Sequence, residues 1–205
     1  MQIRTAIELH KLGASITDHW DNLSISDLKA YEKIEPYLAP PVRESVYVEW
    51  IWGESGAGKT RYVTELASLD KKKLFHVDEI DGFWSGYMKH PYILIDDFCL
   101  QESDTWYRCL LQVMDKYEHL VDKKYGGSWL YAERVYITAQ HPPWYYWKPF
   151  PNMPHLNPRD EEYPTESDIM ANEKLAQVMR RINKVIHKKY SGGRSIRLPI
   201  YEDLA

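Results

Sequence analysis

The chain has 205 residues, enough for one domain of ordinary size and a small additional segment. Apolar residues make up 44% and charged residues 27%, as in a globular protein, and the net charge of -4 excludes a uniformly basic nucleic-acid coat but not a local basic channel. No apolar run approaches the roughly 18 residues of a membrane span, and Met1 begins no signal-peptide pattern. We therefore expect no membrane partner. Cys99 and Cys109 have neither metal-site nor disulfide spacing.

Residues 1–44 are predicted to form a separate helical segment. Apolar spacing indicates two short helices, over residues 3–12 and 23–34. The prolines at 40–41 then make the chain extended, and we place the boundary to the main domain, residues 45–205, just after them. So small a helical unit buries little surface alone, so we expect it either to pack on the main domain or to join neighbouring subunits.

A glycine-rich stretch follows a predicted strand, residues 46–52, and precedes a predicted helix, residues 61–66. It matches the phosphate-loop pattern G-x-x-x-x-G-K-[ST] at each required position. Its residues are Gly53, Glu54, Ser55, Gly56, Ala57, Gly58, Lys59 and Thr60. Glycines let the backbone curl until its N–H groups face one concavity at a helix N-terminus, which attracts an anion. We expect Lys59 to bind nucleotide phosphates and Thr60 to hold Mg²⁺.

Two adjacent carboxylates end a later apolar run. A short strand is predicted over residues 74–77, and residues 92–95 have the apolar character of a buried parallel strand that ends in Asp96 and Asp97. Ligands bind at this carboxyl edge of open α/β sheets. An acidic pair often marks only a turn. An acidic pair about forty residues after a phosphate loop is instead the expected second half of the phosphate-loop site. We expect Asp96 to act in the metal shell and Asp97 to orient the attacking water.

The next two elements are a helix and a β-hairpin. The helix is predicted from its apolar spacing, with Ser103 and Asp104 available to cap its start. Its stripe contains Trp106, Leu110, Val113, Met114 and Tyr117. The hairpin is predicted over residues 120–131, with Gly126–Gly127 as its turn. Lys123 and Lys124 lie beside the tip, where they either face solvent or contact nucleic acid.

The last third of the chain begins with an apolar strand over residues 134–140 that ends in the amide Gln140. Residues 141–164 hold seven of the twelve prolines and are expected to be a long loop. Apolar spacing from Leu175 to Ile186 predicts one amphipathic helix. The region is basic and contains Arg180 and Arg181. A final strand is predicted over residues 195–200.

In that order, these motifs resemble the helicase part of the replication initiator (Rep) proteins of circular single-stranded DNA viruses, the circovirus-like group. The residues that carry the resemblance are 53–60, 93–98, 121–128, 135–140 and 180–182. It implies an α/β fold, a P-loop NTPase of AAA+ type with a mostly parallel central sheet, preceded by a helical oligomerisation segment. It also implies a superfamily 3 helicase that hydrolyses ATP with Mg²⁺, forms a hexamer on single-stranded DNA and works in the host nucleus or cytoplasm.

The resemblance also implies roles for particular residues. Lys59 and Thr60 would serve phosphate and Mg²⁺, and Asp96 and Asp97 would serve metal and water. Lys123 or Lys124 would grip the DNA backbone in a central channel.

From the neighbouring subunit, Arg180 or Arg181 would stabilise the developing phosphoryl charge; the pair is otherwise a solvated helix face. The strand-ending residue is usually Asn in this family and is Gln140 here, which lengthens the side chain by one methylene.

Two other functions remain compatible with the sequence. A small nucleotide or nucleoside kinase also combines a phosphate loop with late arginines, although it leaves the hairpin without a purpose. The second is a binding module that uses ATP only to hold an oligomer together. The His-hydrophobic-His motif of an initiator's nicking domain does not occur here, and residues 145–148 match its tyrosine motif only by chance. The chain is then expected to be a part of an initiator or a lone helicase.

Overall fold

The computed structural model describes residues 39–124, 126–147 and 164–189, together with residues 24, 26, 29, 33, 35–37 and 196–197. Most of the predicted N-terminal helical segment lies outside the described residues, so that prediction stays untested. In the described part of the chain, every helix is too short or too polar to span a lipid bilayer.

A six-stranded sheet with the order β2-β3-β6-β1-β7-β8 forms the centre of the molecule. Its strands are β1 (Tyr47–Trp52), β2 (Leu74–Val77), β3 (Tyr92–Ile95), β6 (Arg134–Ala139), β7 (Lys184–His187) and β8 (Ile196–Arg197). All neighbours pair in parallel except β8, which is antiparallel to β7. The predicted mostly parallel sheet is confirmed, and its central strands are apolar because helices cover both faces.

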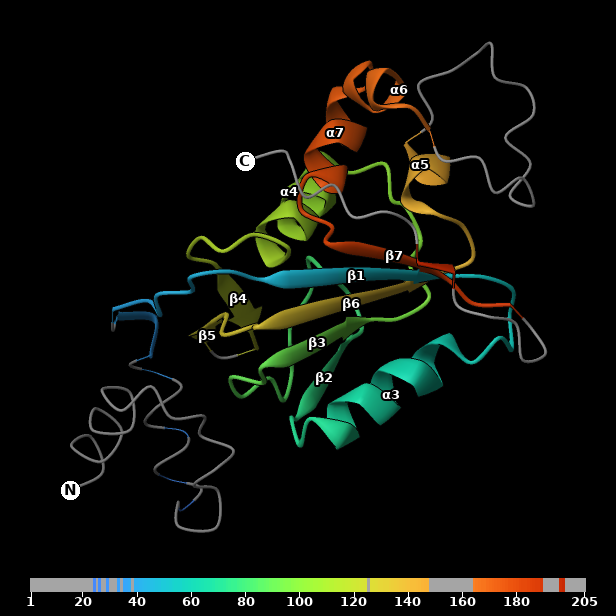
Figure 1. Ribbon diagram of the computed structural model, residues 1–205. Helices are drawn as coiled ribbons and strands as arrows, with labels where there is room; N and C mark the ends of the chain where they lie inside the picture. Colours follow the sequence, from blue (N-terminus) through green and yellow to red (C-terminus); the bar gives the residue numbers. More distant parts are fainter. Residues whose placement is uncertain are drawn as a thin grey trace.

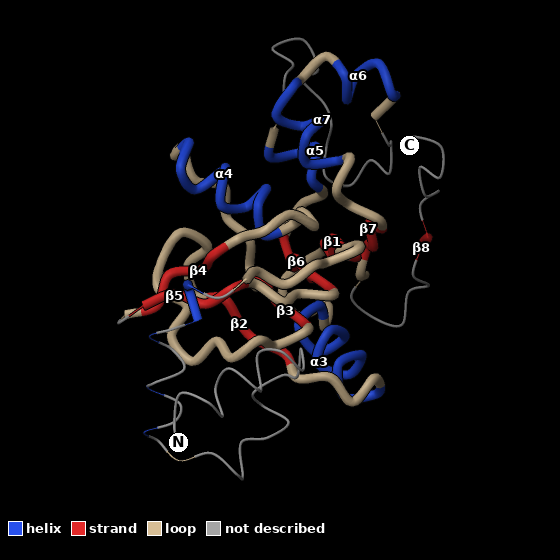
Figure 2. The backbone as a smooth tube through the Cα atoms, turned by 90° about the vertical axis from the view of Figure 1, so that its left-hand side faces the viewer, coloured by secondary structure: helices blue, strands red, loops and turns tan. Residues whose placement is uncertain are grey.

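The helices lie in two layers, one on each face of the sheet (Figure 1, Figure 2). Helix α3 (Lys59–Leu69) covers one face, where Ile51, Val63 and Leu94 are fully buried. The other face carries α4 (Asp104–Val113), α5 (Pro143–Tyr146), α6 (Glu166–Met170) and α7 (Glu173–Met179). The larger core cluster lies there, and it includes Trp50 and Leu175.

Helix α4 matches the predicted cap but not the full predicted stripe. The side-chain oxygen of Ser103 accepts a hydrogen bond from the Trp106 N–H at 3.3 Å, which satisfies one amide of the first turn. Leu110 is fully buried, as expected. Tyr117 lies beyond the end of the helix and is 70% exposed, so its place in the stripe was wrong.

The single amphipathic helix predicted from Leu175 to Ile186 is also wrong. The segment contains α7, whose start is capped by the Asn172 side chain accepting from the Leu175 N–H at 3.1 Å, and then strand β7. The β-branched Val185 and Ile186 pair with Trp50 and Ile51 of β1. Pairing with a buried central strand therefore overrides a spacing that also suits a helix.

The aromatic part of the predicted proline-rich loop forms a short helix instead. Helix α5 begins at Pro143, where a missing N–H costs no helical hydrogen bond. Trp144 and Trp147 are buried, and the Trp147 ring lies 5.8 Å from the ring of Phe98. Residues 148–163 lie outside the described residues.

The predicted hairpin forms, with its turn earlier than expected. Its strands are β4 (Leu120–Lys123) and β5 (Gly126–Trp129), and Lys123 pairs with Gly126. The two glycines therefore begin β5 and do not make the turn. A Cβ at Gly127 would lie 3.1 Å from the Leu120 side chain, which favours glycine at that position.

Candidate functional site

The predicted phosphate loop joins β1 to α3 at the carboxyl edge of the sheet. Gly56 and Gly58 have φ angles of 80° and 78°, in the left-handed region that glycine enters without strain. Gly58 is the N-cap of α3, and no side chain among the described residues caps that helix. Its first amide groups are therefore directed at the loop, as an anion site requires.

Lys59 is the buried cation of this loop, with 6% of its surface exposed. Its Nζ donates hydrogen bonds to the carbonyl oxygens of Gly53 at 2.9 Å and Glu54 at 3.1 Å. An ammonium group held by two neutral carbonyls keeps its full charge available. A phosphate oxygen offers a stronger, charge-assisted partner in the same place.

Thr60 and Asp96 meet across the gap between α3 and β3. The Thr60 hydroxyl donates to the two Asp96 carboxylate oxygens at 2.9 and 3.2 Å. Adjacent ligands of an octahedral Mg²⁺ with bonds of about 2.0–2.1 Å are also about 2.9 Å apart. Both are hard oxygen ligands, so the residues present fit the cation that the sequence predicts.

Thr138 of β6 is fully buried and bonds both acidic residues, the carboxylate of Asp96 and the backbone N–H of Asp97. Its hydroxyl donates a short hydrogen bond to Asp96 and accepts one from the Asp97 N–H at 2.9 Å. The Phe98 N–H then donates to the Thr138 carbonyl at 2.7 Å. These contacts hold Asp97 at φ 48°, a left-handed conformation that is rare outside glycine, and leave its side chain exposed at the carboxyl edge. A non-glycine residue held in this way is typical of functional sites.

Strand β7 closes the other side of the loop. A Cβ at Gly53, where φ is 147°, would collide with the carbonyl oxygen of Lys188. The Lys188 N–H donates to the Trp52 carbonyl at 2.7 Å, and the Trp52 and His187 rings stack at 3.6 Å. Glycine at the first position of the loop therefore allows β7 to approach, and β7 fixes where the loop begins.

The remaining predicted residues lie at two different edges. Gln140 is exposed and follows β6 at the carboxyl edge, with Asp96 and Asp97. Lys123 ends β4 and Lys124 follows it in the hairpin, which lies toward the opposite, amino edge (Figure 1). Lys124 is exposed and Lys123 is half-buried.

The two adjacent arginines have different surroundings. Arg180 is the C-cap of α7 and is exposed. Arg181 is half-buried and binds Asp115, with Nε–Oδ2 and Nη2–Oδ2 distances of 3.0 and 2.7 Å. Its Nη1 also donates to the Gln177 carbonyl at 2.7 Å. Arg181 is therefore engaged within its own chain.

The sequence reasoning overlooked Thr138 and Asp115. A polar residue inside the apolar run 135–139 was a usable signal for Thr138, because buried polar groups need partners. Asp115 gave no such signal, since its partner Arg181 is 66 residues away.

Two comparisons with known proteins found matches to this chain. The profile of a family described as RNA helicase matches residues 49–138, from β1 through Thr138. The chain is 30% identical over 97 residues to the replication-associated protein of Goose circovirus, and the match covers 45% of this chain and 30% of that protein. The chain thus spans less than a third of the curated relative that it matches. These matches show that residues 49–138 are similar to the helicase domain of circovirus-like replication initiator proteins.

Proposed function

We propose that this chain is an ATP-driven helicase or translocase on single-stranded DNA in rolling-circle replication, which acts as a ring, expected to be a hexamer. The observation that carries the proposal is the set of contacts among Thr60, Asp96, Asp97 and Thr138 beside the phosphate loop. This set supplies ligands for Mg²⁺ and an exposed carboxylate beside the phosphates. Phosphoryl transfer needs little more than such positioning and charge stabilisation.

In this proposal each residue of the site has one task. The loop amides and Lys59 bind the β and γ phosphates of ATP, and Thr60 with Asp96 holds Mg²⁺, which neutralises phosphate charge when bound. Asp97 orients a water molecule toward the γ phosphate, and Gln140 at the same edge assists. Thr138 positions the carboxylate of Asp96 and the backbone of Asp97.

Arg180 supports a site shared between subunits. Helix α7 ends at the amino edge, where Asn183 contacts Val48, whereas the phosphate loop lies at the carboxyl edge. Arg180 thus lies at the opposite end of β7 from its own loop, and we assign it, not Arg181, to the nucleotide of the neighbouring subunit. A cavity of about 380 Å³ beside Arg180, lined by apolar residues such as Met170 and Ile182, offers a surface for that neighbour.

Lys123 and Lys124 supply the contact with DNA. Lysines that bind the phosphate backbone act without regard to sequence, as a translocase requires, and make affinity fall steeply with salt. The two sites then lie at opposite edges of one sheet, which gives hydrolysis at one edge a mechanical path to DNA at the other.

The test is ATP turnover at low salt with and without a single-stranded oligonucleotide, combined with solution mass with ATP and Mg²⁺. We expect turnover that the oligonucleotide stimulates, and an assembly near six subunits. Phosphate transfer to a small acceptor without DNA would instead select a kinase. Nucleotide binding without turnover, unchanged by Asp97→Asn, would select an assembly module.

A further inference from the structure

Three chain segments meet at the amino edge of the sheet, and we call their contacts the amino-edge junction. They are the linker at residues 39–45, the α4–β4 loop at residues 114–119, and the α7–β7 turn at residues 180–183. The central contact is the ion pair between Asp115 and Arg181, whose side chains are 22% and 14% exposed. The third Arg181 bond, to the Gln177 carbonyl, fixes the guanidinium against the end of α7.

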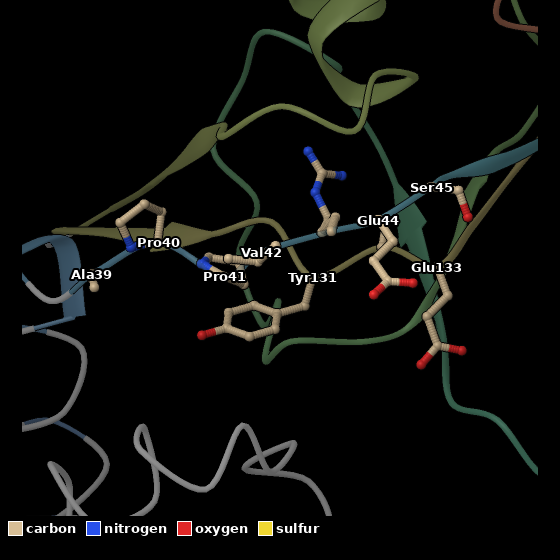
Figure 3. Close-up of a pocket in the computed structure, with 10 residues that line it drawn as sticks. Ala39, Pro40, Pro41, Val42, Glu44, Ser45, Tyr131 and Glu133 are labelled. Carbon is tan, nitrogen blue, oxygen red and sulfur yellow. The ribbon is translucent and has the colours of Figure 1, made fainter.

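The linker inserts a second arginine into the junction. Arg43 Nη2 donates a short hydrogen bond to the Tyr117 carbonyl, within the same loop that carries Asp115. Its Nε and Nη1 are buried without a partner among the described residues. Burial lowers the pKa of Arg43, and the nearby Asp115 partly offsets this. Figure 3 shows the linker, with Pro40 and Pro41, running along Tyr131 and Glu133 just after the hairpin.

The hairpin is tied to the same loop. The Leu130 N–H, after β5, donates to the His119 carbonyl at 2.9 Å, and the Trp84 N–H donates to the Asp122 carbonyl in β4 at 2.8 Å. The loop is thus continuous with β4 and bonded to the residue after β5, while β4 itself is bonded to Trp84. The hairpin that carries Lys123 and Lys124 is therefore connected to Asp115 through this loop.

We propose that Asp115 and Arg181 are positioning residues that couple the hairpin to Arg180, so that nucleic acid bound at the hairpin sets where Arg180 points in the neighbouring site. This inference rests on the proposed function. Apolar residues of similar volume often stabilise a protein as much as a half-buried ion pair does, or more. We therefore attribute the role of this pair to the specific geometry that it imposes and not to net stability. The position of Arg180 depends on that of Arg181 because the two residues are adjacent in a short turn.

The first test follows hydrogen exchange in the full chain when a single-stranded oligonucleotide is added. In the parent, we expect changed exchange both in the hairpin and in the 180–183 turn. In Asp115→Asn, which keeps the side-chain volume but removes the charge, we expect the change in the hairpin alone. An unchanged turn in the parent, despite changes in the hairpin, would overturn the coupling without touching the ATPase proposal.

The second test measures how strongly the oligonucleotide stimulates ATP turnover. For Asp115→Asn we expect DNA binding and unstimulated turnover within about twofold of the parent, and stimulation reduced to a ratio near 1, because the coupling free energy is lost. Arg181→Lys keeps the charge but cannot make all three bonds, so it should lose most of the stimulation as well.

The matched control is Glu49→Gln. It breaks a different ion pair, between the buried Glu49 and the half-buried Lys184 at 3.2 Å, which joins β1 to β7 and does not touch the hairpin. We expect the control to lower the melting temperature yet keep the stimulation. Equal loss of stimulation in the control and in Asp115→Asn would show a merely structural role. Full stimulation in both junction variants would overturn the coupling, and absence of DNA binding by the parent would instead refute the proposed function.

Discussion

The two edges of the central sheet use similar polar groups for different roles. At the carboxyl edge, Thr138 and Thr60 hold Asp96 by hydroxyl groups, and Asp97 remains exposed. At the amino edge, Arg181 holds Asp115 in a half-buried ion pair. Neutral donors position a carboxylate without neutralising it, so it can still serve a cation, whereas an arginine satisfies its partner's charge. The comparison shows that the type of partner separates a chemical site from a mechanical connection.

The largest effect is expected from Lys59→Ala at the carboxyl edge. Loss of one charged donor to the transferred phosphates should lower ATP turnover on the order of 10²–10³-fold. The melting temperature should change little, because within the described residues Lys59 bonds just two loop carbonyls. Steady-state turnover and thermal unfolding of the same sample measure both. A stable variant with parent turnover would remove Lys59 from the chemistry.

Thr138→Val tests whether hydroxyl positioning matters. The variant leaves the partly buried Asp97 N–H without its partner and Asp96 without one donor, at a cost of about 1–3 kcal/mol in unfolding free energy. Misplaced carboxylates should also lower turnover by up to about 100-fold. Thr138→Ser keeps the hydroxyl and is the control. Turnover at the parent level in Thr138→Val would show that the hydroxyl does not matter.

Two glycines of the phosphate loop give a matched pair. Gly53→Ala should destabilise by about 1–3 kcal/mol or more, because its Cβ meets the Lys188 carbonyl. At Gly58 a Cβ meets open space, so Gly58→Ala should cost only the left-handed backbone strain, about 1 kcal/mol. Urea unfolding compares them. The reverse order would contradict the close approach of β7 to the loop.

The smallest effect concerns pH at the amino edge. Burial, with help from the cation of Arg43, lowers the pKa of His119 to about 4. Below pH 6.5 the unfolded chain binds a proton at His119, whereas the folded chain does not. The free energy of unfolding therefore falls as pH decreases from 6.5 toward 4. We expect His119→Gln to remove on the order of 1 kcal/mol of this loss by pH 5. Urea unfolding of parent and variant at pH 7 and pH 5 measures the difference, and parallel losses would contradict it.

The sequence predicted the carboxyl edge better than the amino edge for a physical reason. The phosphate loop and the strand before Asp96 are local patterns, in which a few neighbouring residues determine the backbone. The prediction of one helix from Leu175 to Ile186 was wrong. The apolar spacing suits a helix, but pairing with β1, which is far away in sequence, makes the end of this segment a strand. The Asp115–Arg181 pair likewise depends on the folded positions of two distant turns, which no short window contains.

The central claim, that each nucleotide is hydrolysed between a phosphate loop and the Arg180 of a neighbour, is tested most directly by mixing two inactive variants. Lys59→Ala keeps Arg180, and Arg180→Ala keeps the loop, so a mixed ring contains some interfaces with both intact. We predict that the mixture, with oligonucleotide, regains turnover well above either variant alone. Mixtures that assemble together but stay inactive at every ratio, or full turnover by Arg180→Ala alone, would contradict the shared site.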